Sequence, residues 1–220
     1  MFPILIATAA LALPPFDPTN FVDRVDNPYL PLTPGSVYRY EGSKDGKRAL
    51  DVVKITRAKK NIQGVNATVV SDRLYLNGRL EERTSDWYAQ DKTGAVWYLG
   101  EDTAELDSHG KVKTTEGSWE TGVNGARPGI FMPLHPRVGG GGLQEFYKGH
   151  AEDHFRVLST RARVSTPFVS STRALRTKEW TPLEPGVVTV KYYVRGIGPV
   201  MERDVKGGTE FSHLVSFRKG

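Results

Sequence analysis

The sequence predicts an all-β protein, built as a single antiparallel barrel or a strongly curved sheet of about ten strands. Three observations support this fold class. Turn dipeptides recur at short intervals, and the segments between them alternate apolar with polar residues. No segment longer than about ten residues has a helical period free of glycine and proline. We therefore expect the β domain to occupy residues 35–220.

Composition narrows the class of protein further. A chain of 220 residues can bury the core of one domain without metal or disulfide support. The absence of cysteine excludes disulfides, thiolate metal sites and cysteine nucleophiles. The net charge of +5 is mildly basic, but no recognisable nucleic-acid-binding module accompanies it. We therefore expect no nucleic-acid partner.

The chain begins with an apolar stretch, MFPILIATAALA, over residues 1–12. It is too short to span a bilayer, and Ala10-Leu11-Ala12 resembles a signal-peptidase site, although no Lys or Arg precedes it. We predict a signal peptide over residues 1–12. A secreted, periplasmic or cell-envelope location follows, and we expect no transmembrane segment because no later stretch is long and apolar enough.

Residues 13–34 are rich in proline, which lacks a backbone donor and biases its predecessor away from helix. This segment predicts an extended strap on the domain surface.

Hairpin turns then follow one another. Turn dipeptides, whose Asn-Gly and Asp-Gly members favour tight hairpins, separate runs rich in Val, Tyr, Leu and Thr. They are Asp45-Gly46, Asn77-Gly78, Thr93-Gly94, His109-Gly110 and Gly207-Gly208. The clearest strand is Val188 to Arg195, where Val188, Val190, Tyr192 and Val194 share one face.

Residues 117–142, GSWETGVNGARPGIFMPLHPRVGGGG, interrupt this pattern. The glycine and proline density precludes a long regular element, and a connection of this length in a compact domain is usually functional. The apolar side chains of Trp119, Phe131 and Met132 predict a lid that folds onto the barrel and contacts a ligand. Residues 139–142 would be its hinge.

Several long stretches of the chain resemble one family of proteins. They are NPYLPLTPGSVYRY, GEDTAEL, EGSWETGVNGARPGIFMP, QEFYKGHAED and TKEWTPLEPGVVTVKYYVRGIGPVMERDVKGG. Together they resemble an uncharacterised family of exported bacterial β-rich proteins. The resemblance implies a secreted or envelope-associated β domain and no particular activity. The run RVGGGGLQEFY departs from the family pattern, which has polar and aromatic residues in place of Gly141-Gly142-Leu143.

Two histidines in KGHAEDHF, His150 and His154, are candidate metal ligands. On a helix they would share a face, but Ala151 occupies the position where a zincin needs glutamate. On one strand, ligands two residues apart lie about 6.6 Å from each other, too far for three of them to reach one ion. A solvated polar strand is therefore the favoured interpretation, with a metal site as the alternative.

Acidic residues near the ends of two expected strands are candidate catalytic groups. They are Glu101, Asp102, Glu145, Glu152 and Asp153. Carboxylates held close together raise one another's pKa and can divide acid and base roles, as they do in glycosidases. Solvated turn carboxylates are the more common outcome.

Two hypotheses for function follow. The leading one is an exported or envelope-associated module that binds an apolar or amphipathic small molecule inside the barrel. The alternative is a carboxylate-based hydrolase or lyase, with or without an assisting metal ion, that acts on a glycan or another envelope polymer. The chain has no phosphate-binding loop or dinucleotide fingerprint, so we expect no cofactor.

Overall fold

The computed structural model describes residue 13 and residues 15–220. The predicted signal peptide, residues 1–12, lies outside the described residues and stays a prediction. No helix in the described residues is both long enough and apolar enough to cross a bilayer.

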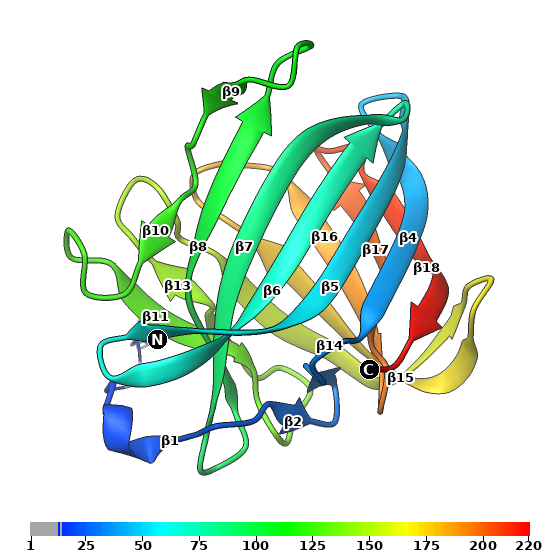
Figure 1. The fold of residues 1–220 in the computed structure, drawn as a ribbon. Helices are drawn as coiled ribbons and strands as arrows, with labels where there is room; N and C mark the ends of the chain where they lie inside the picture. Colours follow the sequence, from blue (N-terminus) through cyan, green and yellow to red (C-terminus); the bar gives the residue numbers. More distant parts are fainter. Residues whose placement is uncertain (1–12, 14) are drawn as a thin grey trace, which may run out of the picture.

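One antiparallel sheet of sixteen strands forms the body of the protein and curls into a barrel (Figure 1). Its long strands, in chain order, are β4 (Val37–Lys44), β5 (Lys47–Ile62), β6 (Val65–Leu76), β7 (Arg79–Asp91), β8 (Val96–Leu106), β11 (Arg127–Met132), β14 (His154–Ser165), β15 (Ser170–Trp180), β16 (Val188–Val194), β17 (Gly198–Lys206) and β18 (Phe211–Arg218). Strands that follow one another in the chain are mostly neighbours in the sheet, and β18 pairs with β4. The predicted all-β class and barrel shape are confirmed.

A short segment nearly closes the sheet. Residues 141–146 carry β12 (Gly141–Leu143), which pairs with β14, and β13 (Glu145–Phe146), which pairs with β11. One stretch of six residues therefore contacts both edges of the sheet. Gly129 and Gly141 allow this close approach, since a Cβ on either would lie less than 2.5 Å from a backbone oxygen.

The expected number of strands, about ten, was too low. The additional strands are β1 (Phe21–Val22), β9 (Val112–Thr114), β10 (Trp119–Glu120), β12 and β13, and a separate hairpin joins β2 (Asp26–Asn27) to β3 (Leu30–Pro31). Each has two or three residues, too few to show an alternating pattern. Pairing with a long neighbour, rather than local sequence, makes them strands.

Residues 117–142, expected to form a lid, contribute strands to the sheet instead of lying over the barrel as one loop. Both β10 and β11 pair with β8, and β12 pairs with β14. The apolar side chains of this segment are buried because the backbone of the segment continues the sheet beside β8. Residues 121–126 and 133–140 form the connections between these strands.

The strap crosses one end of the barrel, at the bottom of Figure 1. A 3₁₀ turn, η1 (Pro18–Asn20), leads into β1, which pairs with β7. Leu30 and Leu32 are buried in the same core as Tyr38 and Ile55. Asn27, 1% exposed, anchors the strap because its side-chain amide donates to the carbonyls of Gly94 and Pro133. The strap thus closes this end of the barrel.

Candidate functional site

A cavity of about 330 Å³ lies inside the barrel. This volume is within the range of small-molecule sites in proteins. The wall is formed by inward-facing residues of β4 to β8, β11 and β15 to β18, together with the strap and residues 144, 145 and 153. An interior this wide is what an eight-stranded or slightly larger barrel leaves when side chains do not fill it.

The wall is apolar near the strap. We call this part the apolar floor; it consists of Leu30, Leu32, Val53, Ile55 and Val70. Farther along the same strands the wall becomes acidic, because alternate residues of a strand face the same side. On β5 the inward residues Ile55 and Val53 are followed by Asp51.

The neighbouring strands repeat this order. On β6, Val70 precedes Asp72 in the direction away from the strap; on β7, Tyr88 precedes Asp86. On β8, Tyr98 precedes Glu101. Strict alternation would place the acid two residues after Tyr98. It comes three residues after because the pairing of β7 with β8 shifts register between Trp87 and Tyr88. Neighbouring strands run in opposite directions, so the shared order means that the cavity is polarised along the barrel.

Eight carboxylates line the cavity, and we call them the carboxylate belt. They are Asp51, Asp72, Asp86, Glu101, Glu145, Asp153, Glu179 and Glu202. The only basic side chain among the lining residues that the structure describes is Lys191. Its Nζ lies 2.9 Å from Glu179 Oε2 and 3.6 Å from Glu202 Oε1. Lys191 therefore compensates two of the eight carboxylates.

Like charges also face one another across neighbouring strands. Asp86 and Glu101 are direct partners in the β7–β8 register. Such an arrangement is unfavourable when both groups are ionised. The Tyr98 hydroxyl donates to Asp86 Oδ1 at 2.7 Å, which favours ionisation of Asp86, whereas Glu101 accepts no side-chain hydrogen bond among the described residues.

Burial shifts the titration of the belt toward the neutral form. It raises the pKa of Asp51 to about 6 and the pKa of Glu202 to about 7. Burial, reinforced by a neighbouring carboxylate, raises the pKa of Asp86 to about 7, of Glu145 to about 8 and of Glu101 to about 9. Several belt groups therefore hold protons at neutral pH when the cavity contains no compensating charge.

Burial and neighbouring charges also shift the pKa values of other groups that line the cavity. Burial raises the pKa of Asp72 well above its usual value, and Asp51 and Asp72 lie close enough to share a proton. Burial also raises the pKa of Asp153. For Lys191, burial alone would lower the pKa, but Glu179 and Glu202 outweigh it and hold the pKa well above the ordinary value.

Among the described residues, two belt oxygens have no hydrogen-bond partner. They are Glu145 Oε2 and Asp51 Oδ1. Glu145 is 6% exposed, so bulk water does not replace the missing donor. A buried polar atom left unpaired costs free energy unless a ligand or a proton satisfies it.

Aromatic rings form the wall next to Asp86. Tyr88 and Tyr98 stack with ring centroids 4.7 Å apart, and the edge of Phe131 packs against both rings. Trp119 packs edge-on against Tyr98 at 5.5 Å. The belt is therefore bordered by aromatic rings as well as by carboxylates.

A second cavity of about 170 Å³ continues the first. The two share Tyr40, Asp51, Asp72, Glu202 and Ser212. The second cavity adds Glu82 and Glu210, together with Lys44, whose Nζ lies 3.4 Å from Glu210. The acidic lining thus extends toward the end of the barrel opposite the strap.

The structure brings together three of the five carboxylates singled out from sequence. Glu101, Glu145 and Asp153 line the cavity. Asp102 is exposed on the outer face of β8. Glu152 belongs to a turn, where its Oε1 accepts a hydrogen bond from the Gly149 N–H. Neither of these two lines the cavity.

The predicted ligand-contacting residues separate in the same way. Phe131 lines the cavity. Trp119, 4% exposed, lies behind Tyr98, and Met132, 2% exposed, is part of the core. Of the three, only Phe131 can touch a molecule in the cavity without rearrangement.

The segment KGHAEDHF is neither a helix nor a single strand. Tyr147 and Ala151 pair across a tight turn, and β14 begins at His154. The His150 ring stacks on Tyr147 and its Nδ1 lies 3.2 Å from Glu116 Oε1, while the His154 ring stacks on Trp180. Within the described residues, no three His, Asp or Glu side chains form a group that could hold a metal ion.

Five belt carboxylates and Lys191 were missed from sequence. The missed acids are Asp51, Asp72, Asp86, Glu179 and Glu202. A sequence signal did exist, because Asp51 and Asp72 fall in register with apolar residues that had to face the core. This signal is weak because acids on strands are usually solvated.

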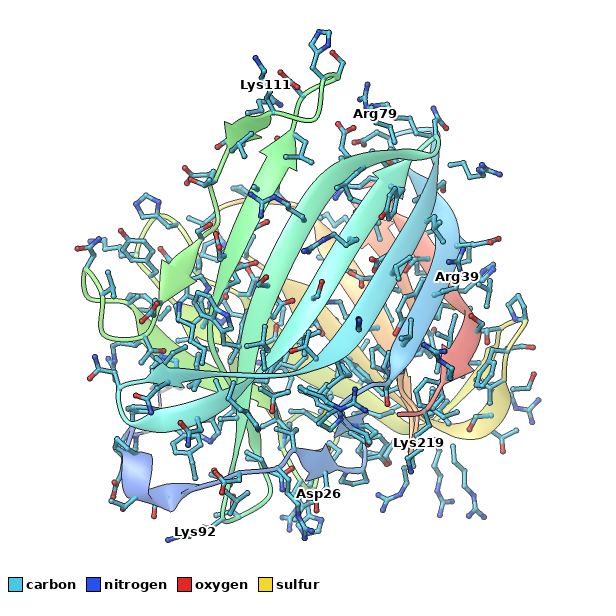
Figure 2. The ribbon with its side chains drawn as sticks, viewed as in Figure 1. Asp26, Arg39, Arg79, Lys92, Lys111 and Lys219 are labelled. Carbon is cyan, nitrogen blue, oxygen red and sulfur yellow. The ribbon has the colours of Figure 1, made fainter. Side chains whose placement is uncertain are left out.

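Among the described residues, Lys191 and Lys44 are the only Lys or Arg side chains that line either of these two cavities. Figure 2 shows the labelled side chains of Arg39, Arg79, Lys92, Lys111 and Lys219 around the periphery of the barrel, and all five are exposed. A chain with a net charge of +5 therefore encloses an acidic interior.

Comparison with known proteins adds little to this picture. No protein-family model and no curated protein matches the chain. Among solved structures, it is similar to one described as "a putative lipoprotein" from Parabacteroides distasonis, with a TM-score of 0.47 and 8% sequence identity. The match covers 87% of this chain and 99% of the other. The resemblance to a family of exported bacterial proteins stays a prediction.

Proposed function

We propose that the protein is an exported or envelope-associated binding module that holds one amphipathic small molecule inside the barrel. The observation that carries this proposal is the cavity of about 330 Å³ with an apolar floor at one end and polar groups at the other. A barrel without a binding role would be expected to fill this space with side chains, as protein interiors are close-packed.

The shape of the cavity favours a small ligand. The strap closes the barrel beside the apolar floor, so a molecule would enter from the end where the second cavity lies. An apolar portion of the ligand would displace water from Leu30, Ile55 and Val70, which provides the driving force for binding.

Titration with N-phenyl-1-naphthylamine, a neutral dye that fluoresces in apolar sites, tests the proposal. The wild type should show saturable binding of one dye molecule. Met201→Trp places a large ring in the cavity and should abolish binding, whereas Val205→Trp, at an exposed position on the same strand, should not. Equal binding by both variants would place the dye outside the cavity and contradict the proposal.

The export component has its own test. N-terminal sequencing of the protein from the envelope fraction of its source should begin near Leu13. A cytoplasmic pool that retains Met1 would contradict it.

A hydrolase remains the second candidate because Glu101, Glu145 and Asp153 converge on one cavity. A protonated Glu101 could act as a general acid, and Glu179, whose Oε2 lies 2.9 Å from Lys191 Nζ, could provide the second carboxylate. A cavity of this size suits a small substrate better than a polymer. Release of reducing ends from envelope polysaccharide, lost in Glu101→Gln and Glu145→Gln, would favour this alternative.

A further inference from the structure

The charge inside the cavity is unbalanced. Lys191 accounts for Glu179 and Glu202, and the other six belt carboxylates have no basic side chain within 4.0 Å among residues 13 and 15–220. Buried carboxylates need a counter-charge or a proton. In the empty barrel, protons compensate. A positively charged ligand would replace them.

An unsatisfied buried atom points independently to a missing donor. Glu145 is 6% exposed and faces the cavity, and its Oε2 has no hydrogen-bond partner. The indole N–H of Trp119 lies close enough to lower the pKa of Glu145, yet among the described residues this N–H is itself buried without a hydrogen-bond partner, so it does not complete a bond to Oε2. An N–H from a ligand in the cavity would do so.

The cavity changes from apolar to acidic along the barrel, and this order indicates what the rest of the ligand would be. The apolar floor closes the strap end, and Asp51, Asp72, Asp86 and Glu101 follow it on four adjacent strands. We propose that the barrel selects an organic cation with an apolar body, of the alkylammonium type, whose body lies on the apolar floor and whose nitrogen lies in the carboxylate belt. This proposal rests on the proposed function and specifies its ligand class.

The arrangement suits an organic cation better than a metal ion. The belt carboxylates come from different strands around the barrel, and no three of them in the described residues form a group that could hold a metal. The stacked rings of Tyr88 and Tyr98 lie next to Asp86. Ring faces attract ammonium groups, with a contribution of about 0.5–2 kcal/mol for each contact.

Affinity should therefore rise with pH. The groups that face the ligand from β5 to β8 are Asp51, Asp72, Asp86 and Glu101; those from the other side are Glu145, Asp153, Glu179, Glu202 and Lys191. Five tyrosines complete the titratable lining among the described residues and stay neutral, because burial raises the pKa of each: Tyr38 to about 12, and Tyr40, Tyr88, Tyr98 and Tyr193 well above the usual value. An alkylammonium ion keeps its charge from pH 5 to pH 8, so the change in affinity comes from the protein.

Calorimetric titrations with three ligands of equal chain length test the proposal: n-octylammonium, 1-octanol and octanoate. At pH 8, n-octylammonium should bind at least about tenfold more tightly than 1-octanol, a difference of about 1.4 kcal/mol, and octanoate should bind more weakly than both. At pH 5 the preference for the cation should shrink toward equality.

Two double variants locate the effect. Asp86→Asn/Glu145→Gln neutralises two belt groups and should lower the affinity for n-octylammonium at pH 8 by about tenfold or more, with 1-octanol unchanged. Asp102→Asn/Glu152→Gln removes the same charge next to the cavity and should leave both affinities unchanged. Retained 1-octanol binding also shows that the first variant is folded.

The outcomes separate the two proposals. If 1-octanol binds as tightly as n-octylammonium at pH 8, or if octanoate binds best, the inference of a cationic ligand is overturned while the proposed binding function stands. If Met201→Trp leaves every affinity unchanged, or if none of the three ligands binds, the proposed function fails as well.

Discussion

Replacing Glu101 by Gln should stabilise the protein at alkaline pH. Glu101 faces Asp86 across β7–β8, and burial together with that neighbour raises its pKa from 4.5 to about 9. The unfolded chain releases this proton near pH 4.5, whereas the folded protein holds it until about pH 9. Between these values the unfolded state binds fewer protons, so the free energy of unfolding falls as pH rises.

The magnitude follows from the width of this window. One carboxyl contributes a slope of about 1.4 kcal/mol per pH unit, or about 4 kcal/mol between pH 5 and pH 8. The Glu101→Gln variant has no carboxyl at this position, so its free energy of unfolding does not fall for this reason. Its stability relative to wild type should therefore rise by up to about 4 kcal/mol over these three units.

Urea unfolding at pH 5 and pH 8 measures the effect. Asp102→Asn is the matched control because Asp102 follows Glu101 on β8 and is exposed on its outer face. If Glu101→Gln and Asp102→Asn change stability by the same amount at both pH values, the reasoning about a buried acidic interior is refuted.

Three further predictions concern packing, charge and metal. Lys191→Met should lower the free energy of unfolding, measured in urea at pH 7, by about 3 kcal/mol because buried Glu179 loses its partner. The control, Lys178→Met on the other face of the sheet, should lower it by less than about 1 kcal/mol. Gly100→Ala should lower the melting temperature far more than Gly110→Ala: both glycines have positive φ, but only at Gly100 would a Cβ lie 2.3 Å from the Trp119 carbonyl oxygen. Zinc, nickel or manganese should not raise the melting temperature, and a rise abolished by His150→Ala or His154→Ala would show that a metal binds there.

The hairpins were predictable because their turns depend on local chemistry. Asn77 and Gly78 have φ of 50° and 85°, the pair of positive values that Asn-Gly supplies most readily in a two-residue turn. The turn at Gln63-Gly64 has the same geometry, with φ of 50° and 86°. The sequence does not predict this turn because glutamine, unlike asparagine, does not favour positive φ. The pairing of β5 with β6 imposes the conformation of Gln63.

The candidate site was only partly predictable. Glu101 and Glu145 were singled out because each lies near the expected end of a strand. Asp86 was missed because β7 carries polar residues on both faces, so alternation alone does not tell which face is inside. Register with β8, a contact between strands, places Asp86 opposite Glu101.

The segment KGHAEDHF illustrates the same limit of local pattern. Regular strand geometry would place His150, Glu152 and His154 on one side. In the folded protein, Gly149 adopts a φ of 79° and its N–H donates to Glu152, so the chain turns before β14 begins. A single glycine therefore separates the two histidines into different surroundings.

A crystal structure of the protein with octyltrimethylammonium at pH 8 would test the central claim most directly. The account predicts one molecule in the cavity, with its chain against Leu30, Ile55 and Val70 and its nitrogen between Asp86 and Glu145. A cavity filled by rearranged side chains, or a ligand bound only on the outer surface, would contradict the account.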